Sequence, residues 1–304
     1  MNRGALIAAG AGAALVCAVA GFATWVATLP ELPKLQAIHY STEVVDREGR
    51  LLRPYATEEG RWRLRTRIED VDPRYLDMLI AYEDRRFRKH HGVDPLALVR
   101  GAWLWVRHRE IVSGGSTITM QVARLIEPRT ERTLLAKLRQ MVRAVELERR
   151  YGKDEILAAY LSLAPYGGNL EGLRAASLSY FGKEPKRLTR SEAALLVALP
   201  QSPEARRPDR SPEIARRARD RVLARVLAAG AITKQEAEEG RVERIPTTRH
   251  GVPMHAAHAA EKALAERPDL AVHRLTIDRR QQAALEALLA ERVEQFGPAV
   301  SGAI

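Results

Sequence analysis

Two adjacent carboxylates open the stretch of the chain that is best suited to chemistry. Glu83 and Asp84 follow an apolar turn, and Phe87 and His90 come four and seven residues after Glu83. This spacing predicts that Glu83, Phe87 and His90 share one helix face, provided that the helix continues that far. A carboxylate in a cleft can remove a proton from an attacking hydroxyl. The alternative is that Glu83 and Asp84 are a solvated pair of surface charges.

A glycine pair followed by hydroxyl and amide side chains lies downstream. Gly114 and Gly115 precede Ser116, Thr117 and Gln121. Because glycine lacks a Cβ atom, such a loop can bring its backbone close to a polar ligand. Read alone, the two glycines are equally consistent with an ordinary turn.

Basic residues follow this loop, at Arg124, Arg129, Arg132 and Lys137. A transferase that uses an activated phosphate donor needs a base for the attacking hydroxyl and cations for the charge on the leaving phosphate. The planar guanidinium group of arginine suits phosphate oxygens. These residues therefore predict a phosphate-binding site, and the alternative is a solvated basic helix face.

The order ED-x-x-F-x-x-H-x-G and then GGSTIT-x-Q resembles the peptidoglycan glycosyltransferases (family 51), the polymerase half of class A penicillin-binding proteins. Further motifs follow in the family's order, over residues 153–161, 166–172, 180–183 and 219–223. The resemblance covers about residues 40–240. It implies a mainly α, lysozyme-like transglycosylase fold, which agrees with the helix-rich pattern that follows Pro73.

The resemblance implies a role for each matching residue. Glu83 is the expected general base. Arg124 and Arg132 are the expected contacts of the donor's pyrophosphate. The full set of expected substrate-binding residues is Asp84, Phe87, His90, Gly115, Ser116, Thr117, Gln121, Arg124, Arg132, Lys137, Gln140 and Arg219.

Three positions depart from the family's pattern. Gln140 stands where the third motif has a glutamate, Met120 where the loop has a glutamine, and Ser162 where the fourth motif has an asparagine. An amide forms hydrogen bonds but cannot exchange protons, so Gln140 is expected to position substrate rather than to act as an acid or base. The changes at Met120 and Gln140 both resemble the 1C branch of the family.

The reaction implied by the resemblance joins lipid-linked disaccharide-peptide units. The 4-hydroxyl of an incoming lipid II attacks C1 of the terminal sugar of the growing chain, inverting that carbon and expelling undecaprenyl pyrophosphate. The implied partners are lipid II, the growing lipid-linked glycan chain, membrane lipids and other cell-wall synthesis proteins, without nucleic acid. No cofactor is evident and no metal ligands are predicted, although the resemblance allows a divalent cation, Mg or Mn.

The composition restricts the class of partner. A net charge of +11 and a pI of about 10.1 favour an anionic partner, such as a nucleic acid, an anionic membrane surface or a phosphate-bearing substrate. Four Phe and four Trp are few for an aromatic platform that stacks single-stranded bases. The single cysteine, Cys17, excludes an internal disulfide and a cysteine metal cluster.

The chain begins with an uncharged run from Gly4 to Leu29, which ends at Pro30. This run exceeds the roughly 20 apolar residues that cross a bilayer as a helix. It predicts a transmembrane anchor over residues 1–30, followed by a stalk over 31–42. The expected location is the bacterial inner (cytoplasmic) membrane, with the catalytic domain on the periplasmic side. A cleaved signal peptide is the alternative, because Ala18-Val19-Ala20 has the small-x-small form.

Local patterns predict the elements that position the site. A small hairpin is expected over residues 43–52, and short strands over 61–65 and 275–278. Helices are expected from Pro95 after the cap Asp94, from Thr133, over 153–163, over 193–199 after the cap Ser191, from Pro212 to Gly230, and after the cap Thr233. An apolar stripe at helical spacing is expected at Leu134, Leu138, Met141 and Val145.

The pattern breaks after residue 240, where we place a domain boundary. Residues 43–240 are expected to form the glycosyltransferase domain. Residues 241–304 are expected to be a linker and the start of a truncated transpeptidase domain. No serine has a lysine three residues later and no K-T-G occurs, so we expect this chain to polymerise glycan without cross-linking it.

Three other functions remain open on the sequence. A lytic enzyme of lysozyme-like fold would use a cleft glutamate as an acid toward neutral glycan, for which phosphate-binding cations are not needed. A nucleic-acid-binding protein would explain the charge but not the anchor. A non-catalytic, membrane-anchored cell-wall scaffold is consistent with the departures at Gln140 and Met120.

Overall fold

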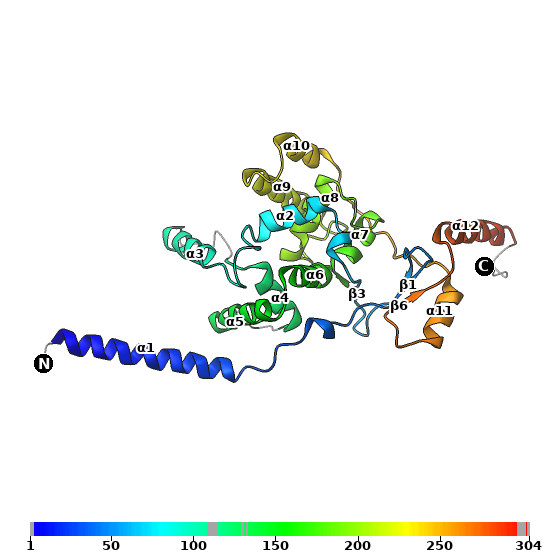
Figure 1. Cartoon of the computed structure of the whole chain (residues 1–304). Helices are drawn as coiled ribbons and strands as arrows, with labels where there is room; N and C mark the ends of the chain where they lie inside the picture. Colours follow the sequence, from blue (N-terminus) through cyan, green and yellow to red (C-terminus); the bar gives the residue numbers. More distant parts are fainter. Residues whose placement is uncertain (1–2, 109–114, 129–130, 132, 297–301, 303–304) are drawn as a thin grey trace.

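The computed structural model describes residues 3–108, 115–128, 131, 133–296 and 302, and it is mainly helical (Figure 1). The helices are α1 (Arg3–Ala27), α2 (Pro73–Glu83), α3 (Pro95–His108), α4 (Ile118–Ile126), α5 (Leu134–Arg150), α6 (Lys153–Leu163), α7 (Leu173–Phe181), α8 (Arg190–Ala198), α9 (Pro212–Ala228), α10 (Lys234–Val242), α11 (Ala257–Glu266) and α12 (Arg279–Gln295). The strands are β1 (Glu43–Val45), β2 (Leu51–Pro54), β3 (Trp62–Arg63), β4 (Pro165–Gly167), β5 (Leu170–Glu171) and β6 (Val272–Arg274). The predicted mainly α class is confirmed, and the likeness to lysozyme stays a prediction.

Helix α8 forms the centre of the core. Every residue from Ser191 to Ala198 except Glu192 is buried, and the helix packs against α2, α7, α9 and α10. The predicted apolar helix is therefore confirmed, but its cap is Thr189 rather than Ser191. Thr189 Oγ1 accepts the Glu192 N–H at 3.1 Å, and the Glu192 carboxylate accepts the Thr189 N–H at 2.8 Å. This reciprocal pair satisfies the free donors at the helix start.

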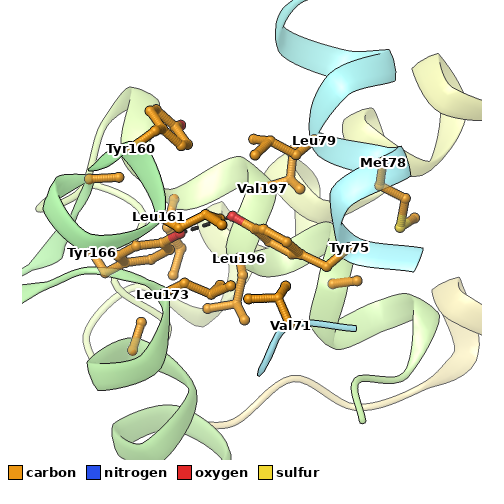
Figure 2. Close-up of a cluster of buried hydrophobic side chains, with 14 of the residues drawn as sticks. Val71, Tyr75, Met78, Leu79, Tyr160, Leu161, Tyr166, Leu173, Leu196 and Val197 are labelled. Atoms are coloured by element: carbon orange, nitrogen blue, oxygen red, sulfur yellow. Dashed lines mark hydrogen bonds between the residues drawn. The ribbon is translucent and has the colours of Figure 1, made fainter. Parts of the chain in front are cut away.

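A tyrosine-rich cluster joins α2 to the segment after α6 (Figure 2). Tyr75 on α2 and Tyr166 on β4 are fully buried, and their hydroxyls form a hydrogen bond of 3.0 Å. Tyr160 on α6 is also buried beside them. Burial is the main reason, and the nearby Glu83 carboxylate the second, that the pKa of Tyr160 is raised well above its usual range. The core therefore extends directly to the end of α2, where the site begins.

Local capping signals place most helix starts where the sequence predicts them. Asp94 Oδ1 accepts the backbone N–H groups of Leu96 and Ala97, and α3 starts at Pro95. Thr133 caps α5 and Thr233 caps α10 in the same way. Each cap acts within three residues of itself, which is why the sequence alone identifies it.

Helix α2 ends earlier than the spacing of its residues predicts. Its last residue is Glu83, and Asp84 is a non-helical cap with φ −155° and ψ 75°. Phe87 and His90 therefore lie beyond the helix, in turns, and the predicted common helix face of Glu83, Phe87 and His90 is wrong. The physical reason is tertiary: the buried Asp84 carboxylate accepts hydrogen bonds from His90 and from the Ile118 N–H, which no helical residue at this point could reach together.

The predicted apolar stripe of α5 is not its buried face. The Leu134 side chain is 91% exposed, whereas Arg143, Ala144 and Leu147 are buried. Arg143 is retained there because it pairs with Glu127 and donates to the Pro30 carbonyl. The inward side of α5 thus combines apolar burial at Ala144 and Leu147 with the ion pair of Arg143.

Two small sheets complete the fold. The first has the order β2-β1-β6: β1 and β2 are the predicted hairpin, and β6 joins β1 in parallel. The second has the order β3-β5-β4. Because β6 spans Val272–Arg274, the strand predicted over 275–278 is displaced, and Asp278 instead caps α12 by accepting the N–H groups of Arg280 and Gln281.

The sheet of β2, β1 and β6 has a small core of its own. Val44, Leu52 and Ala260 are fully buried together and lie apart from the main helical core. Residues on both sides of the predicted boundary at 240 thus build one sheet, to the right in Figure 1. The division into domains over 43–240 and 241–304 stays a prediction.

Helix α1 begins at Arg3 and lies apart from the other helices (Figure 1). Among the residues with described placement, no helix reaches the length and apolarity of a membrane span. The anchor expected over residues 1–30 therefore stays a prediction.

Candidate active site

Glu83 lies at the end of α2, half-exposed, with each carboxylate oxygen held by a side-chain amide. Gln121 Nε2 on α4 donates to Oε2 at 2.9 Å, and Gln201 Nε2 donates to Oε1 at 2.7 Å. The two amides hold the carboxylate in a fixed orientation. Each oxygen keeps lone-pair capacity after one hydrogen bond, so Glu83 can still accept a proton.

Asp84 connects the end of α2 to the start of α4. Its carboxylate is buried, accepts the Ile118 N–H at 3.0 Å and contacts His90 Nε2 at 2.9 Å. The predicted loop is also held at the start of α4, where Thr117 Oγ1 accepts the Met120 N–H at 3.1 Å. Asp84 and Thr117 thereby fix the position of Gln121 relative to Glu83.

Phe87 and His90 support the site from below rather than line its surface. Both side chains are buried, and their rings meet edge to face at 6.3 Å between centroids. His90 Nδ1 lies 3.8 Å from Glu148 Oε1 and makes no hydrogen bond within the described residues. Both residues are buried beside the site, and the expectation that they bind substrate stays a prediction.

A glycine on this loop allows the close approach of α5. Gly92 has φ +88°, and a Cβ atom there would lie 2.5 Å from the carbonyl carbon and oxygen of Ala144. Only glycine fits this contact. Thr117 Oγ1 donates to the Gly92 carbonyl at 2.5 Å, so the loop, α4 and α5 are locked to one another.

A basic groove of about 560 Å³ lies between α4 and α5. Arg124, Lys137 and Gln140, three of the predicted binding residues, line it together. Glu127 also lines it but is paired with Arg139 and Arg143, so its charge is neutralised locally. The exposed guanidinium of Arg124 makes no ion pair within the described ranges of the chain. Four basic side chains against two carboxylates, Glu127 and Glu131, line the groove, which therefore carries net positive charge.

Lys137 joins this groove to the glycine loop. Its Nζ donates to Ser116 Oγ, and Ser116 with Gly115 lines a smaller pocket that also contains Glu83. Burial, and next the charge of Arg124, lowers the pKa of Lys137 below its ordinary value. A second cation so close to a partly buried ammonium is typical of a site that binds an anion.

Two further predicted site residues are Arg132 and Arg219. Arg132 lies outside the described residues. Arg219 is fully buried on α9, where its guanidinium donates to Ser191 Oγ and to the Glu243 and Arg241 carbonyls. These contacts tie α9 to α8 and to the end of α10, and the expectation that Arg219 binds substrate stays a prediction.

The sequence analysis missed Gln201, Arg206 and Glu148. Gln201 follows the proline that ends the buried helix, and nothing in its local pattern relates it to Glu83. Glu148 accepts from Thr119 Oγ1 and Lys153 Nζ, both at 2.6 Å, beneath the loop. The fold brings these residues to the site through contacts between positions that are distant in the sequence, so no local pattern identifies them.

The resemblance allows a divalent cation, Mg or Mn, as a cofactor. Within residues 3–108, 115–128, 131, 133–296 and 302, no group of three or more His, Cys, Asp or Glu side chains is arranged to hold a metal ion. The Asp84 carboxylate, the nearest to Glu83 in sequence, is already bound by His90 and Ile118.

Comparison with known proteins gives the same family along most of the helical body. Residues 48–227 match the family described as "Transglycosylase". "Penicillin-binding protein 1C" of Escherichia coli (strain K12) is 47% identical over 211 residues, which are 69% of this chain and 27% of that protein. "Penicillin-binding protein 1A" of Aquifex aeolicus (strain VF5) is 39% identical over 199 residues, 66% of this chain and 27% of that protein.

Among solved structures, a crystal structure of Penicillin-Binding Protein 1A from Haemophilus influenzae at 2.6 Å resolution overlaps 84% of this chain and 30% of that chain, with 18% identity and a TM-score of 0.39. The chain spans 27% of the length of each of the two curated relatives.

Proposed function

The chain belongs to the peptidoglycan glycosyltransferases of class A penicillin-binding proteins, most like the 1C branch, and on this premise we propose that it polymerises glycan chains from lipid II. The observation that carries the proposal is the placement of Glu83. It is the half-exposed carboxylate between a pair of amide donors, and its pocket is joined through Ser116 and Lys137 to the basic groove. A base and a phosphate-binding surface thus lie next to each other.

Glu83 acts as the general base in this proposal. The 4-hydroxyl of lipid II gives its proton to the Glu83 carboxylate as its oxygen forms a bond with C1 of the terminal sugar of the growing chain. The bond from C1 to the pyrophosphate oxygen breaks, with inversion at C1, and undecaprenyl pyrophosphate leaves. Glu83 then returns the proton to water. The amides of Gln121 and Gln201 hold the carboxylate in place for this step.

The basic groove supplies the second requirement. Negative charge grows on the pyrophosphate as the C1–O bond breaks, and fixed cations stabilise that charge. Arg124 and Lys137 are the groove cations without a carboxylate partner among the described residues. Gln140 lines the same groove and can donate or accept a hydrogen bond there, but it cannot transfer a proton.

The divalent cation, a membrane anchor over residues 1–30 and a location on the outer side of the bacterial inner membrane remain part of this proposal, together with membrane lipids as partners. The uncharged run from Gly4 to Leu29 supports the anchor. The growing lipid-linked glycan chain is the donor, and other cell-wall synthesis proteins are further proposed partners.

Incubation of the whole chain with lipid II tests the function directly. We expect lipid-linked polymer from the wild type and none from Glu83→Gln, because loss of a general base costs roughly 10²- to 10⁴-fold in rate. Thermal unfolding should show that the variant is folded. Release of fragments from finished glycan, without synthesis, would indicate a lytic enzyme instead, and polymer from Glu83→Gln at the wild-type rate would remove Glu83 from the mechanism.

A further inference from the structure

Gln201 holds one oxygen of the Glu83 carboxylate. It is the last residue of the short 3₁₀ helix η3 (Leu199–Gln201), and its Nε2 donates to Glu83 Oε1 at 2.7 Å. The two residues are 118 positions apart in the sequence. Gln121 holds the other oxygen, so Gln201 completes a pair of donors whose members come from different parts of the fold.

Arg206 determines which end of the Gln201 amide faces Glu83. An amide can present either its oxygen or its nitrogen, but arginine has only donors. Arg206 Nη1 donates to Gln201 Oε1 at 3.1 Å, which leaves the Gln201 Nε2 donors for the carboxylate. The same Arg206 nitrogen donates to the Ala198 carbonyl at 2.6 Å.

The Ala198 contact fixes Arg206 to the central helix of the core. Ala198 is the last residue of α8 and is fully buried, Arg206 is half-buried, and Gln201 is exposed. A chain of hydrogen bonds thus runs from the core, through a cation and an amide, to the carboxylate in the cleft. Because Arg206 is held by the Ala198 carbonyl and donates to Gln201 Oε1, the Gln201 amide presents its nitrogen to Glu83.

We propose that Gln201, oriented by Arg206, is a positioning residue that holds the Glu83 carboxylate aimed into the cleft for the acceptor hydroxyl. This inference rests on the proposed function of Glu83. Gln201 acts through Glu83 and takes up no proton itself. Amide donors occupy two of the lone-pair positions on the Glu83 oxygens, which leaves others to accept the proton of the acceptor hydroxyl.

Substitution of Gln201 in the whole chain tests the proposal with lipid II as the probe. Gln201→Ala removes one hydrogen bond to a charged group, and we expect kcat to fall about 10- to 100-fold. KM for lipid II should stay within about twofold, since a residue that acts on the base alone leaves substrate binding unchanged. Gln201→Glu should lower kcat further, because it places a second carboxylate against Glu83.

Gln235 provides the matched control. It is exposed on α10, and its Nε2 donates to the Glu239 carboxylate at 2.9 Å, the same chemical pair away from the cleft. Gln235→Ala and Gln235→Glu should leave kcat and KM unchanged. Thermal unfolding of all four variants should match the wild type, because both glutamines are at the surface.

A double-mutant cycle tests the part played by Arg206. Arg206→Met frees the Gln201 amide to rotate, so it should lower kcat in the wild-type background. In the Gln201→Ala background the same change should have little further effect, because residues that act through one chain are not additive.

The outcomes separate this inference from the proposed function. If the wild type polymerises lipid II and Glu83→Gln does not, but Gln201→Ala keeps the wild-type kcat, the inference on Gln201 is overturned and the function stands. A rise in KM alone would also overturn it, since Gln201 would then bind substrate. A wild-type chain that makes no polymer would overturn both.

Discussion

The Asp84 carboxylate accepts the backbone N–H of Ile118 at 3.0 Å, which ties the residue after Glu83 to the first residue of α4. Gln121 lies on the first turn of that helix and donates to Glu83. One buried hydrogen bond therefore sets the distance between the proposed base and one of the amides that hold it. Asp84, which the sequence presents as half of a charge pair, is a structural link between two motifs.

Asp84→Ala should lower both stability and activity. It leaves the buried Ile118 N–H and His90 Nε2 without their acceptor, and each unpaired buried group costs about 1–3 kcal/mol of the free energy of unfolding. Chemical denaturation gives that free energy. Asp77→Ala, at an exposed position on the same helix, is the control and should change stability by less than about 0.5 kcal/mol. Equal effects of the two substitutions would contradict the role given to Asp84.

Arg124→Ala should weaken use of the pyrophosphate-bearing donor and leave the fold intact. The side chain is exposed in the basic groove, so its removal opens no cavity. A hydrogen bond to a charged group is worth about 1.5–3 kcal/mol, which corresponds to a loss of roughly 10- to 100-fold in kcat/KM. Arg280→Ala, exposed on α12, is the matched control. Normal polymerisation by Arg124→Ala would make this residue ordinary surface charge.

Lys137 should give a distinct pH dependence of stability. Burial, with Arg124 as the second cause, lowers the pKa of Lys137 from the ordinary 10.5. Between the lowered pKa and 10.5, the unfolded chain therefore binds the Lys137 proton more tightly than the folded chain does. The contribution of Lys137 to the free energy of unfolding is therefore unfavourable at neutral pH, and it rises with pH between the lowered pKa and 10.5.

Lys137→Met keeps most of the stem and removes the charge. The difference in the free energy of unfolding between the wild type and this variant should shift in favour of the wild type as pH increases from 7 toward 10.5. Denaturant titrations at several pH values measure this difference. A shift in the opposite direction would mean that the folded state binds the proton more tightly.

Arg219→Met should act on stability rather than on substrate use. It leaves Ser191 Oγ and the carbonyls of Arg241 and Glu243 without a donor, on the order of 1–3 kcal/mol for each acceptor that stays buried and unpaired. Arg216→Met on the same helix is the control, because Arg216 is exposed and pairs with the exposed Glu213. A folded Arg219→Met variant of wild-type stability, with a raised KM for lipid II, would indicate that Arg219 binds substrate.

Local signals in the sequence determined a large part of this protein. Asp94, Thr133 and Thr233 mark helix starts because a cap acts on donors two or three residues away. The apolar run of α8 identified the core helix, because a helix that is apolar on all sides is buried. The order of the motifs, from Glu83 to Lys137, identified the family. It also indicated that the glycine loop and the basic residues belong to one site.

Only the tertiary structure decided which of these residues face a ligand. His90 and Phe87 turn inward because α2 ends at Glu83, and it ends there because Asp84 binds the start of a helix 34 residues later. Arg219 is buried by its contacts with α8 and with the end of α10. Gln201 reaches Glu83 from 118 residues away. Such contacts depend on how the helices pack, and packing joins positions that no local spacing relates.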